Sequence, residues 1–160
     1  MKHQHACALA LGIGAVAGLR PTTALAVIAS ALRRGRIRPG HSSFARIVSA
    51  STSKRIAGFA ISDLVVDKLP FTRSRLDAAP LASRIVSGAI CGAAIYGTVK
   101  KPIVEGAVFG GLGSLAGAIT GYHVRQRLSR DMPDFVVALL EDALAVGAGA
   151  TIVTLAAATE

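Results

Sequence analysis

Two acidic residues stand next to each other inside a long apolar stretch near the end of the chain. Glu141 and Asp142 lie within residues 135–158, which contain no lysine or arginine. An ionisable group inside a bilayer costs at least about 2.5–3.5 kcal/mol, so such groups usually face a bundle interior, a polar cavity or an opposite charge. Carboxylates in that setting could bind or relay protons or cations, or could form ion pairs that only fix helix packing. Both roles stay open at this point.

An arginine followed by a proline lies inside the first apolar stretch, residues 6–32. Proline removes the hydrogen bond to the carbonyl four residues earlier and tends to kink a helix. Arg20 must find an acceptor inside the bilayer, because an isolated charge there is costly. A helix break at Pro21 with a cation beside it predicts a pair between Arg20 and Glu141 or Asp142.

Asp63 is a further candidate for this polar site, because it lies in a short apolar segment, residues 56–66. With the acids of the last stretch and Arg20 as counter-charge, it would complete a small set of ionisable groups inside the membrane. Such sets mark ion pathways in membrane proteins.

Motifs of catalytic chemistry are missing from the sequence. There is no nucleophile elbow, no HExxH and no paired serine and lysine within an apolar stretch, so we expect no catalytic residues and no enzyme. Cys7 and Cys91 are isolated from each other, and the histidines show no metal-ligand spacing. We therefore expect no metal ion and no cofactor.

The composition predicts a helical membrane protein. Of the 160 residues 52% are hydrophobic, only 4% are aromatic and none is tryptophan. The apolar residues are gathered in runs, and about 20 residues at about 1.5 Å each cross the hydrocarbon core of a bilayer. The net charge of +9 comes from basic residues that flank these runs. Without a nucleic-acid motif among them, we expect the lipid bilayer as partner and no nucleic acid.

Residues 1–160 are thus expected to form a single all-α domain, a polytopic membrane bundle of four to five glycine-rich helices, one of them short or re-entrant. A basic polar loop is expected over 33–53. The predicted helices cover residues 6–32, 54–68, 80–99, 102–124 and 134–158.

Whether residues 54–68 cross the membrane is tested by the placement of positive charge, which gathers on the cytoplasmic side. If the segment does not cross, the basic residues of 33–84 and 125–130 share one side, opposite Lys2, Lys100 and Lys101. If it crosses, the charges divide almost evenly. The rule therefore favours four full spans, although a short tilted or broken helix could still cross.

The first apolar stretch also resembles a signal peptide, with residues 15–17 as a small-residue cleavage site. The run continues well past that site to Arg33 and Arg34, so we expect it to remain as a membrane helix.

Pairs of glycines four residues apart recur along the apolar stretches. Each pair places two glycines on one helix face, where backbones can approach closely within the bundle or between two copies in a homo-oligomer. The similarity of the first and third pairs would also fit an internal duplication, although any helix rich in glycine and alanine yields such matches. The pairs lie in residues 14–18, 88–92, 106–110 and 117–121.

Several sequence blocks follow one another in a characteristic order: Gly18–Ala24, Asp63–Pro70 with Thr72 and Arg75, Ala82–Ala89, Gly121–Arg125, and Pro133–Phe135 through Glu141 and Asp142. In this order they resemble domain of unknown function 4126, a family of small predicted inner-membrane proteins of bacteria. The family usually has glutamate where this chain has Asp63, and the aspartate has a shorter reach. The resemblance implies a multi-pass protein of the bacterial inner membrane and names no activity.

The sequence therefore predicts an integral membrane protein of unknown activity. Its intramembrane carboxylates favour a small ion- or proton-coupled transporter or channel. The alternative is a structural or assembly protein of the membrane, in which the charges only fix helix packing.

Overall fold

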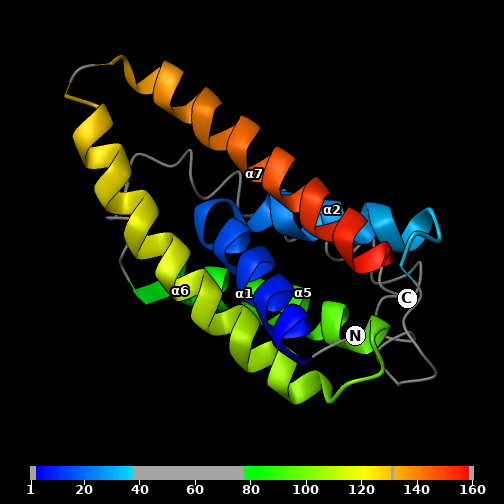
Figure 1. The fold of residues 1–160 in the computed structure, drawn as a ribbon. Helices are drawn as coiled ribbons and strands as arrows, with labels where there is room; N and C mark the ends of the chain where they lie inside the picture. Colours follow the sequence, from blue (N-terminus) through cyan, green and yellow to red (C-terminus); the bar gives the residue numbers. More distant parts are fainter. Residues whose placement is uncertain (1–2, 38–77, 131, 159–160) are drawn as a thin grey trace.

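The computed structural model describes residues 3–37, 78–130 and 132–158, and these residues form five α-helices (Figure 1). The all-α prediction is confirmed. In chain order the helices are α1 (His3–Leu19), α2 (Pro21–Arg33), α5 (Ala78–Thr98), α6 (Ile103–Leu128) and α7 (Asp134–Ala157).

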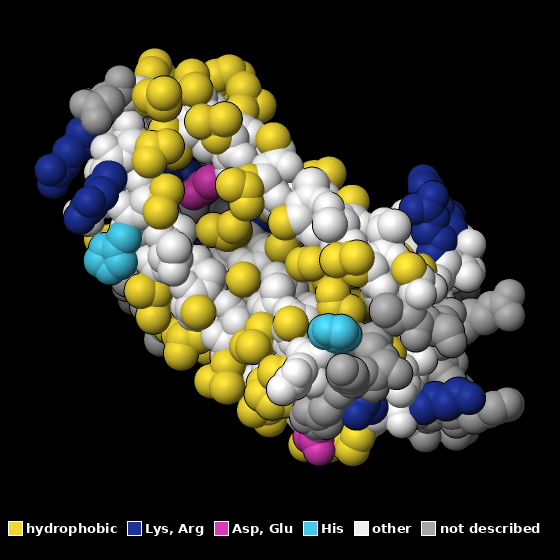
Figure 2. All heavy atoms as spheres, in the orientation of Figure 1, with side chains coloured by type: hydrophobic (Ala, Val, Ile, Leu, Met, Phe, Trp, Pro, Cys, Tyr) yellow, Lys and Arg dark blue, Asp and Glu magenta, His cyan; other side chains and the backbone are white. Residues whose placement is uncertain are grey.

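Three helices are long and apolar enough to cross a membrane, namely Pro80–Thr98, Ile103–Leu128 and Phe135–Ala157. Large hydrophobic side chains remain exposed along them, including Val104 and Leu144. Figure 2 shows such side chains spread over most of the visible face. An apolar outer surface of this extent is the surface expected of a helix bundle surrounded by lipid.

The single helix predicted over residues 6–32 is wrong, because the structure divides this stretch into α1 and α2. Arg20, between them, has an extended backbone with φ −142° and ψ 97°. The ring of Pro21 disfavours helical backbone at the residue before it. Proline itself suits the first position of a helix, so α2 begins there at once.

The chain reverses direction at this break. The break lies beside Asp142, and Gly12 lies against Ile152, so α1 runs antiparallel to α7. Val27 lies against Gly149, so α2 runs parallel to α7. Helices α1 and α2 therefore form a hairpin whose tip is the break (Figure 1).

The centre of the bundle is formed where α1 and α5 cross α6 through glycines. A side chain at Gly110 would overlap the carbonyl oxygen of Gly88 and crowd Gly92, and one at Gly14 would overlap the carbonyl oxygen of Gly110. Close backbone approach of this kind maximises van der Waals contact between membrane helices. Hydrophobic residues packed around this crossing include the fully buried Ile13.

The remaining predicted helices can be compared with the structure one by one. Helix α5 begins at Ala78 where residue 80 was predicted, and α6 continues to Leu128 where residue 124 was predicted. Helix α7 agrees with the prediction to within a residue. The predicted helix 54–68 lies outside the described residues.

Candidate functional site

The predicted contact between Arg20 and one of the paired acids is present at the helix break. The Nε atom of Arg20 lies 2.7 Å from Oδ1 of Asp142. A charge-assisted hydrogen bond of this length is among the stronger polar contacts in proteins. The two side chains are 32% and 42% exposed, so the pair is only partly enclosed.

The backbone around the break is kept hydrogen-bonded on both sides. The N–H of Arg20 donates to the carbonyl of Val16 at 2.8 Å, and the N–H of Ala24 donates to the carbonyl of Arg20 at 3.3 Å. The last carbonyls of α1 still need donors, because a helix end leaves its final carbonyls without partners inside the helix.

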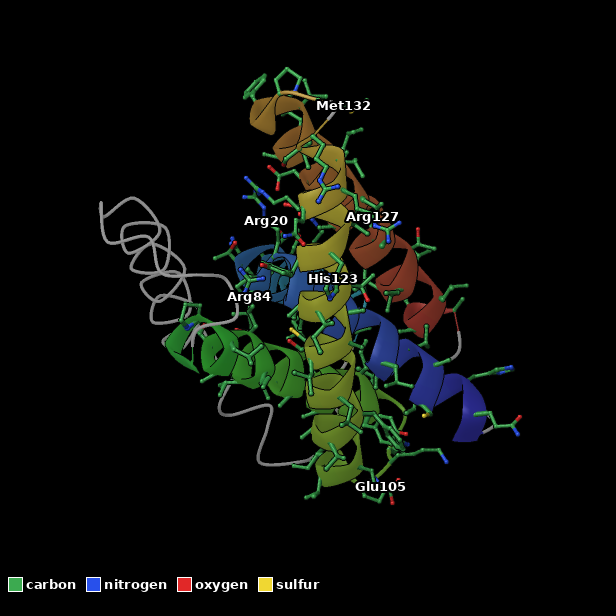
Figure 3. All side chains as sticks on the ribbon, turned by 90° about the vertical axis from the view of Figure 1, so that its left-hand side faces the viewer. Arg20, Arg84, Glu105, His123, Arg127 and Met132 are labelled. Carbon is green, nitrogen blue, oxygen red and sulfur yellow. The ribbon has the colours of Figure 1, made fainter. Side chains whose placement is uncertain are left out.

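Arg84 of α5 supplies those donors. Its Nη1 atom donates to the carbonyl oxygen of Gly18 at 2.6 Å and lies 3.5 Å from that of Leu19. The residue is only 9% exposed, and a buried cation at the carboxyl end of a helix is favourable to the helix dipole. Figure 3 shows Arg20 and Arg84 near each other on one side of α6.

Arg84 was not among the residues predicted for this site. An arginine inside an apolar helix was the signal that could have identified it, because such a charge needs a partner within the membrane. Its own carbonyl oxygen also accepts a hydrogen bond from the Ser114 hydroxyl at 2.7 Å, which joins α5 to α6. The break, α5 and α6 are thus connected through one residue.

Glu141 does not pair with Arg20, although it is adjacent to Asp142. Its Oε2 atom lies 3.3 Å from Nη1 of Arg125, with side-chain exposures of 10% and 27%. Neighbouring residues point about 100° apart around a helix, so the two acids face different partners. Arg125 thus forms an ion pair between α6 and α7.

Both acids lie within α7 but in its first part. Asp142 is seven residues beyond Phe135, or about 10 Å along the helix. Figure 2 shows acidic and basic side chains in a hollow between α6 and α7, surrounded by hydrophobic side chains. The ion pairs are therefore set into an apolar surface that is open on one side.

The other residues considered in the sequence are Asp63 and the two cysteines. Asp63 lies outside the described residues. Cys7 and Cys91 are both free, and Cys91 is buried. Among the described residues, no group of three histidine, cysteine or acidic side chains is placed to hold a metal ion.

The arrangement places an ion pair directly beside a helix end. Arg20 and Asp142 are in contact as opposite charges at the break. Arg84 donates hydrogen bonds to the carbonyls at the end of α1. The site therefore combines an anchored helix end with a partly exposed ion pair.

Comparisons with known proteins place the chain in one family. No curated protein and no solved structure matches it. A family model described as Domain of unknown function (DUF4126) matches residues 7–159, a range that includes the break, Arg84 and both acids of α7. The resemblance seen in the sequence is thereby confirmed. The chain belongs to the DUF4126 family, whose description names no activity.

Proposed function

We propose that this chain is a multi-pass protein of the bacterial inner membrane that works as a small proton- or cation-coupled transporter or channel. The observation that carries the proposal is the Arg20–Asp142 pair, which lies at a helix break and is only partly enclosed. In membrane transporters, broken helices supply ion sites because their ends leave backbone groups and dipoles directed at the site.

In this proposal Asp142 alternates between an anion paired with Arg20 and a protonated or cation-bound carboxylate. Arg20 lowers the cost of the charged form inside the membrane. Arg84 is a positioning residue in this proposal, since it holds the end of α1 through the carbonyl of Gly18. We propose neither an enzymatic step nor a cofactor.

The alternative function is assembly or scaffolding in the membrane, possible for a monomer or for a homo-oligomer formed through glycine-rich faces. One observation favours it: the Arg125–Glu141 pair is well enclosed, with Glu141 only 10% exposed. An enclosed pair of this kind fixes the position of one helix against another. If the Arg20–Asp142 pair served the same purpose, no ion would pass.

Ion flux across reconstituted vesicles distinguishes the two functions. The parent protein and the variants Asp142→Asn and Glu105→Gln are placed in proteoliposomes, and proton or cation entry is followed with an ion-sensitive dye. Glu105 is a matched control, because it is an exposed acid in the first turn of α6. We expect flux with the parent and with Glu105→Gln, and its loss with Asp142→Asn. A parent without flux would favour the assembly function.

A further inference from the structure

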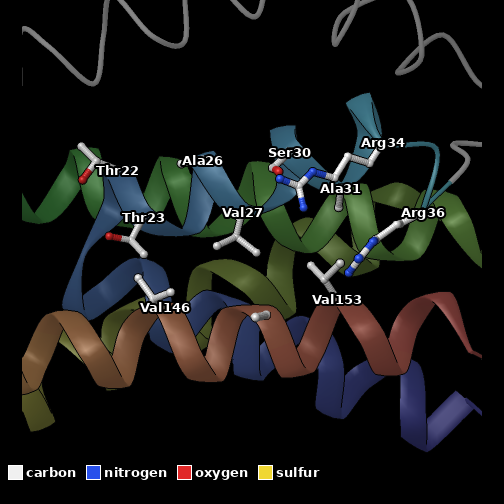
Figure 4. Close-up of a pocket in the computed structure, with 11 residues that line it drawn as sticks. Thr22, Thr23, Ala26, Val27, Ser30, Ala31, Arg34, Arg36, Val146 and Val153 are labelled. Atoms are coloured by element: carbon white, nitrogen blue, oxygen red, sulfur yellow. The ribbon is translucent and has the colours of Figure 1, made fainter.

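A groove of about 550 Å³ lies between α2 and α7 (Figure 4). Its size is within the range of about 300–1,000 Å³ that is usual for small-molecule sites. One end is bordered by Thr23 and Val146, and the other by Arg34 and Arg36. The groove therefore has one end near the helix break and one strongly basic end.

The basic end is suited to an anion. Figure 4 shows the guanidinium groups of Arg34 and Arg36 directed towards the groove, with Ser30 close to Arg34. Within the described part of the chain neither guanidinium has an ion-pair partner, and no acid lines the groove. Guanidinium groups match the oxygens of a phosphate, to which they donate paired hydrogen bonds.

The wall on α7 is apolar. Val146, Ala150 and Val153 line it, opposite Val27 of α2. From Thr23 to the basic end the groove follows α2 for about 16 Å, at about 1.5 Å per residue. This is roughly half of the 30 Å hydrocarbon core, the depth of one lipid leaflet.

The groove also lies at the depth in the bundle that a lipid of one leaflet would occupy. Val153 lies four residues, or about 6 Å, before the end of α7 at Ala157, and Arg36 lies on the same end of the groove. The arginines are thus level with the lipid headgroups, and the apolar wall is level with the acyl chains.

We propose that this groove binds one phospholipid with an anionic headgroup, its phosphate between Arg34 and Arg36 and one acyl chain between α2 and α7. Basic pockets between transmembrane helices are known to recognise anionic headgroups. The inference goes beyond the proposed transport and does not depend on it, since lipid binding requires no movement of an ion.

Native mass spectrometry of the purified protein in mild detergent tests the proposal. Phosphatidylglycerol, phosphatidylcholine and inorganic phosphate are the probes. A double variant, Arg34→Gln with Arg36→Gln, removes the basic end. Arg127→Gln with Arg130→Gln is the matched control, because it removes the same charge from exposed residues at the far end of α6.

A second groove variant, Ala150→Phe, fills the groove without changing its charge. Its control is Ala116→Phe, which places the same side chain on an exposed site of α6.

We expect one bound phosphatidylglycerol on the parent and on both controls, with weaker retention of phosphatidylcholine. The Arg34/Arg36 variant should lose at least about tenfold in affinity, since each arginine near an anionic surface contributes about a fivefold gain. Ala150→Phe should also release the lipid. If both groove variants retained phosphatidylglycerol as strongly as the parent does, the proposal would be overturned. Binding of inorganic phosphate as strongly as of lipid would overturn the assignment to a phospholipid.

Discussion

At the scale of single residues, two arginines bind different groups at the helix break. Arg84 donates to the carbonyls of Gly18 and Leu19, so these two carbonyls at the end of α1 have a side-chain donor. Arg20 is left to pair with Asp142 through its side chain. Because these contacts are made by different arginines, loss of the Arg20–Asp142 pair would leave the hydrogen bonds from Arg84 to α1 in place. This separation is what makes Asp142 a better site candidate than Glu141, whose pair is more enclosed.

Removing one partner of the Arg20–Asp142 pair should cost more stability than removing both. Arg20→Gln alone or Asp142→Asn alone leaves a charge without its partner inside the bundle. We expect each loss to be about 1–3 kcal/mol, below the roughly 3–5 kcal/mol of a fully buried pair, because both side chains are partly exposed. Thermal unfolding in detergent of both single variants and of the double variant measures the coupling. If the loss of stability in the double variant equalled the sum of the losses in the two single variants, the contact between the side chains would be contradicted.

At the scale of elements, the α1–α2 hairpin depends on close contact between α1, α5 and α6. Gly110 lies where Gly14 of α1 and Gly88 of α5 both approach α6. A carbonyl oxygen fills the space that a side chain would need at each of these positions. The break is therefore held at a fixed distance from Arg84 by backbone packing as well as by hydrogen bonds.

An alanine at this crossing should separate the helices. Gly110→Ala would force its methyl group against the backbone of α5, at a cost of at least about 1–3 kcal/mol. Gly147→Ala is the matched control, because nothing lies within 4 Å of the added atom. It should be neutral or stabilising by up to about 1 kcal/mol, since alanine favours helix. Melting temperatures in detergent compare the two, and equal effects would argue against the crossing.

Several elements could be predicted from the sequence because they depend on local patterns. Apolar run length predicted α5, α6 and α7, and the cost of an intramembrane charge predicted that Arg20 meets an acid. The reversal at Pro21 could not be predicted, because a proline that kinks a helix and one that ends it have the same sequence signature. Arg84 meets Gly18, 66 residues earlier in the chain, and Glu141 meets Arg125 on the preceding helix. Both contacts depend on how the helices pack against one another. No local pattern encodes them.

At the scale of the whole molecule, the hairpin changes how the positive charges divide. Helices α2, α5 and α7 run in the same direction, and α1 and α6 run opposite to them. The end of α2 at Arg33 therefore lies with Lys101, which follows α5, and Arg130 lies at the other end of the bundle. This corrects the division expected for four full spans, which grouped Arg33 with Arg130.

Labelling of single cysteines from one side of sealed vesicles should show this division. In a protein without Cys7 and Cys91, Arg33→Cys and Lys101→Cys should react with an impermeant thiol reagent from the same side. Arg130→Cys should react only from the opposite side. A cysteine at 33 that shares the side of 130 would contradict the hairpin and support an unbroken first helix.

The proposed ion site requires that water reach the Arg20–Asp142 pair inside the membrane. Ala138 lies one turn before Asp142 and is partly exposed, whereas Leu144 on the same helix is 62% exposed on a different face. Only a thiol in contact with water forms the reactive thiolate. In bilayers, and in a protein without Cys7 and Cys91, Ala138→Cys should therefore react with a small charged methanethiosulfonate, and Leu144→Cys should not. An unreactive, correctly folded Ala138→Cys would show that the pair is a dry structural contact and would contradict the proposed ion site.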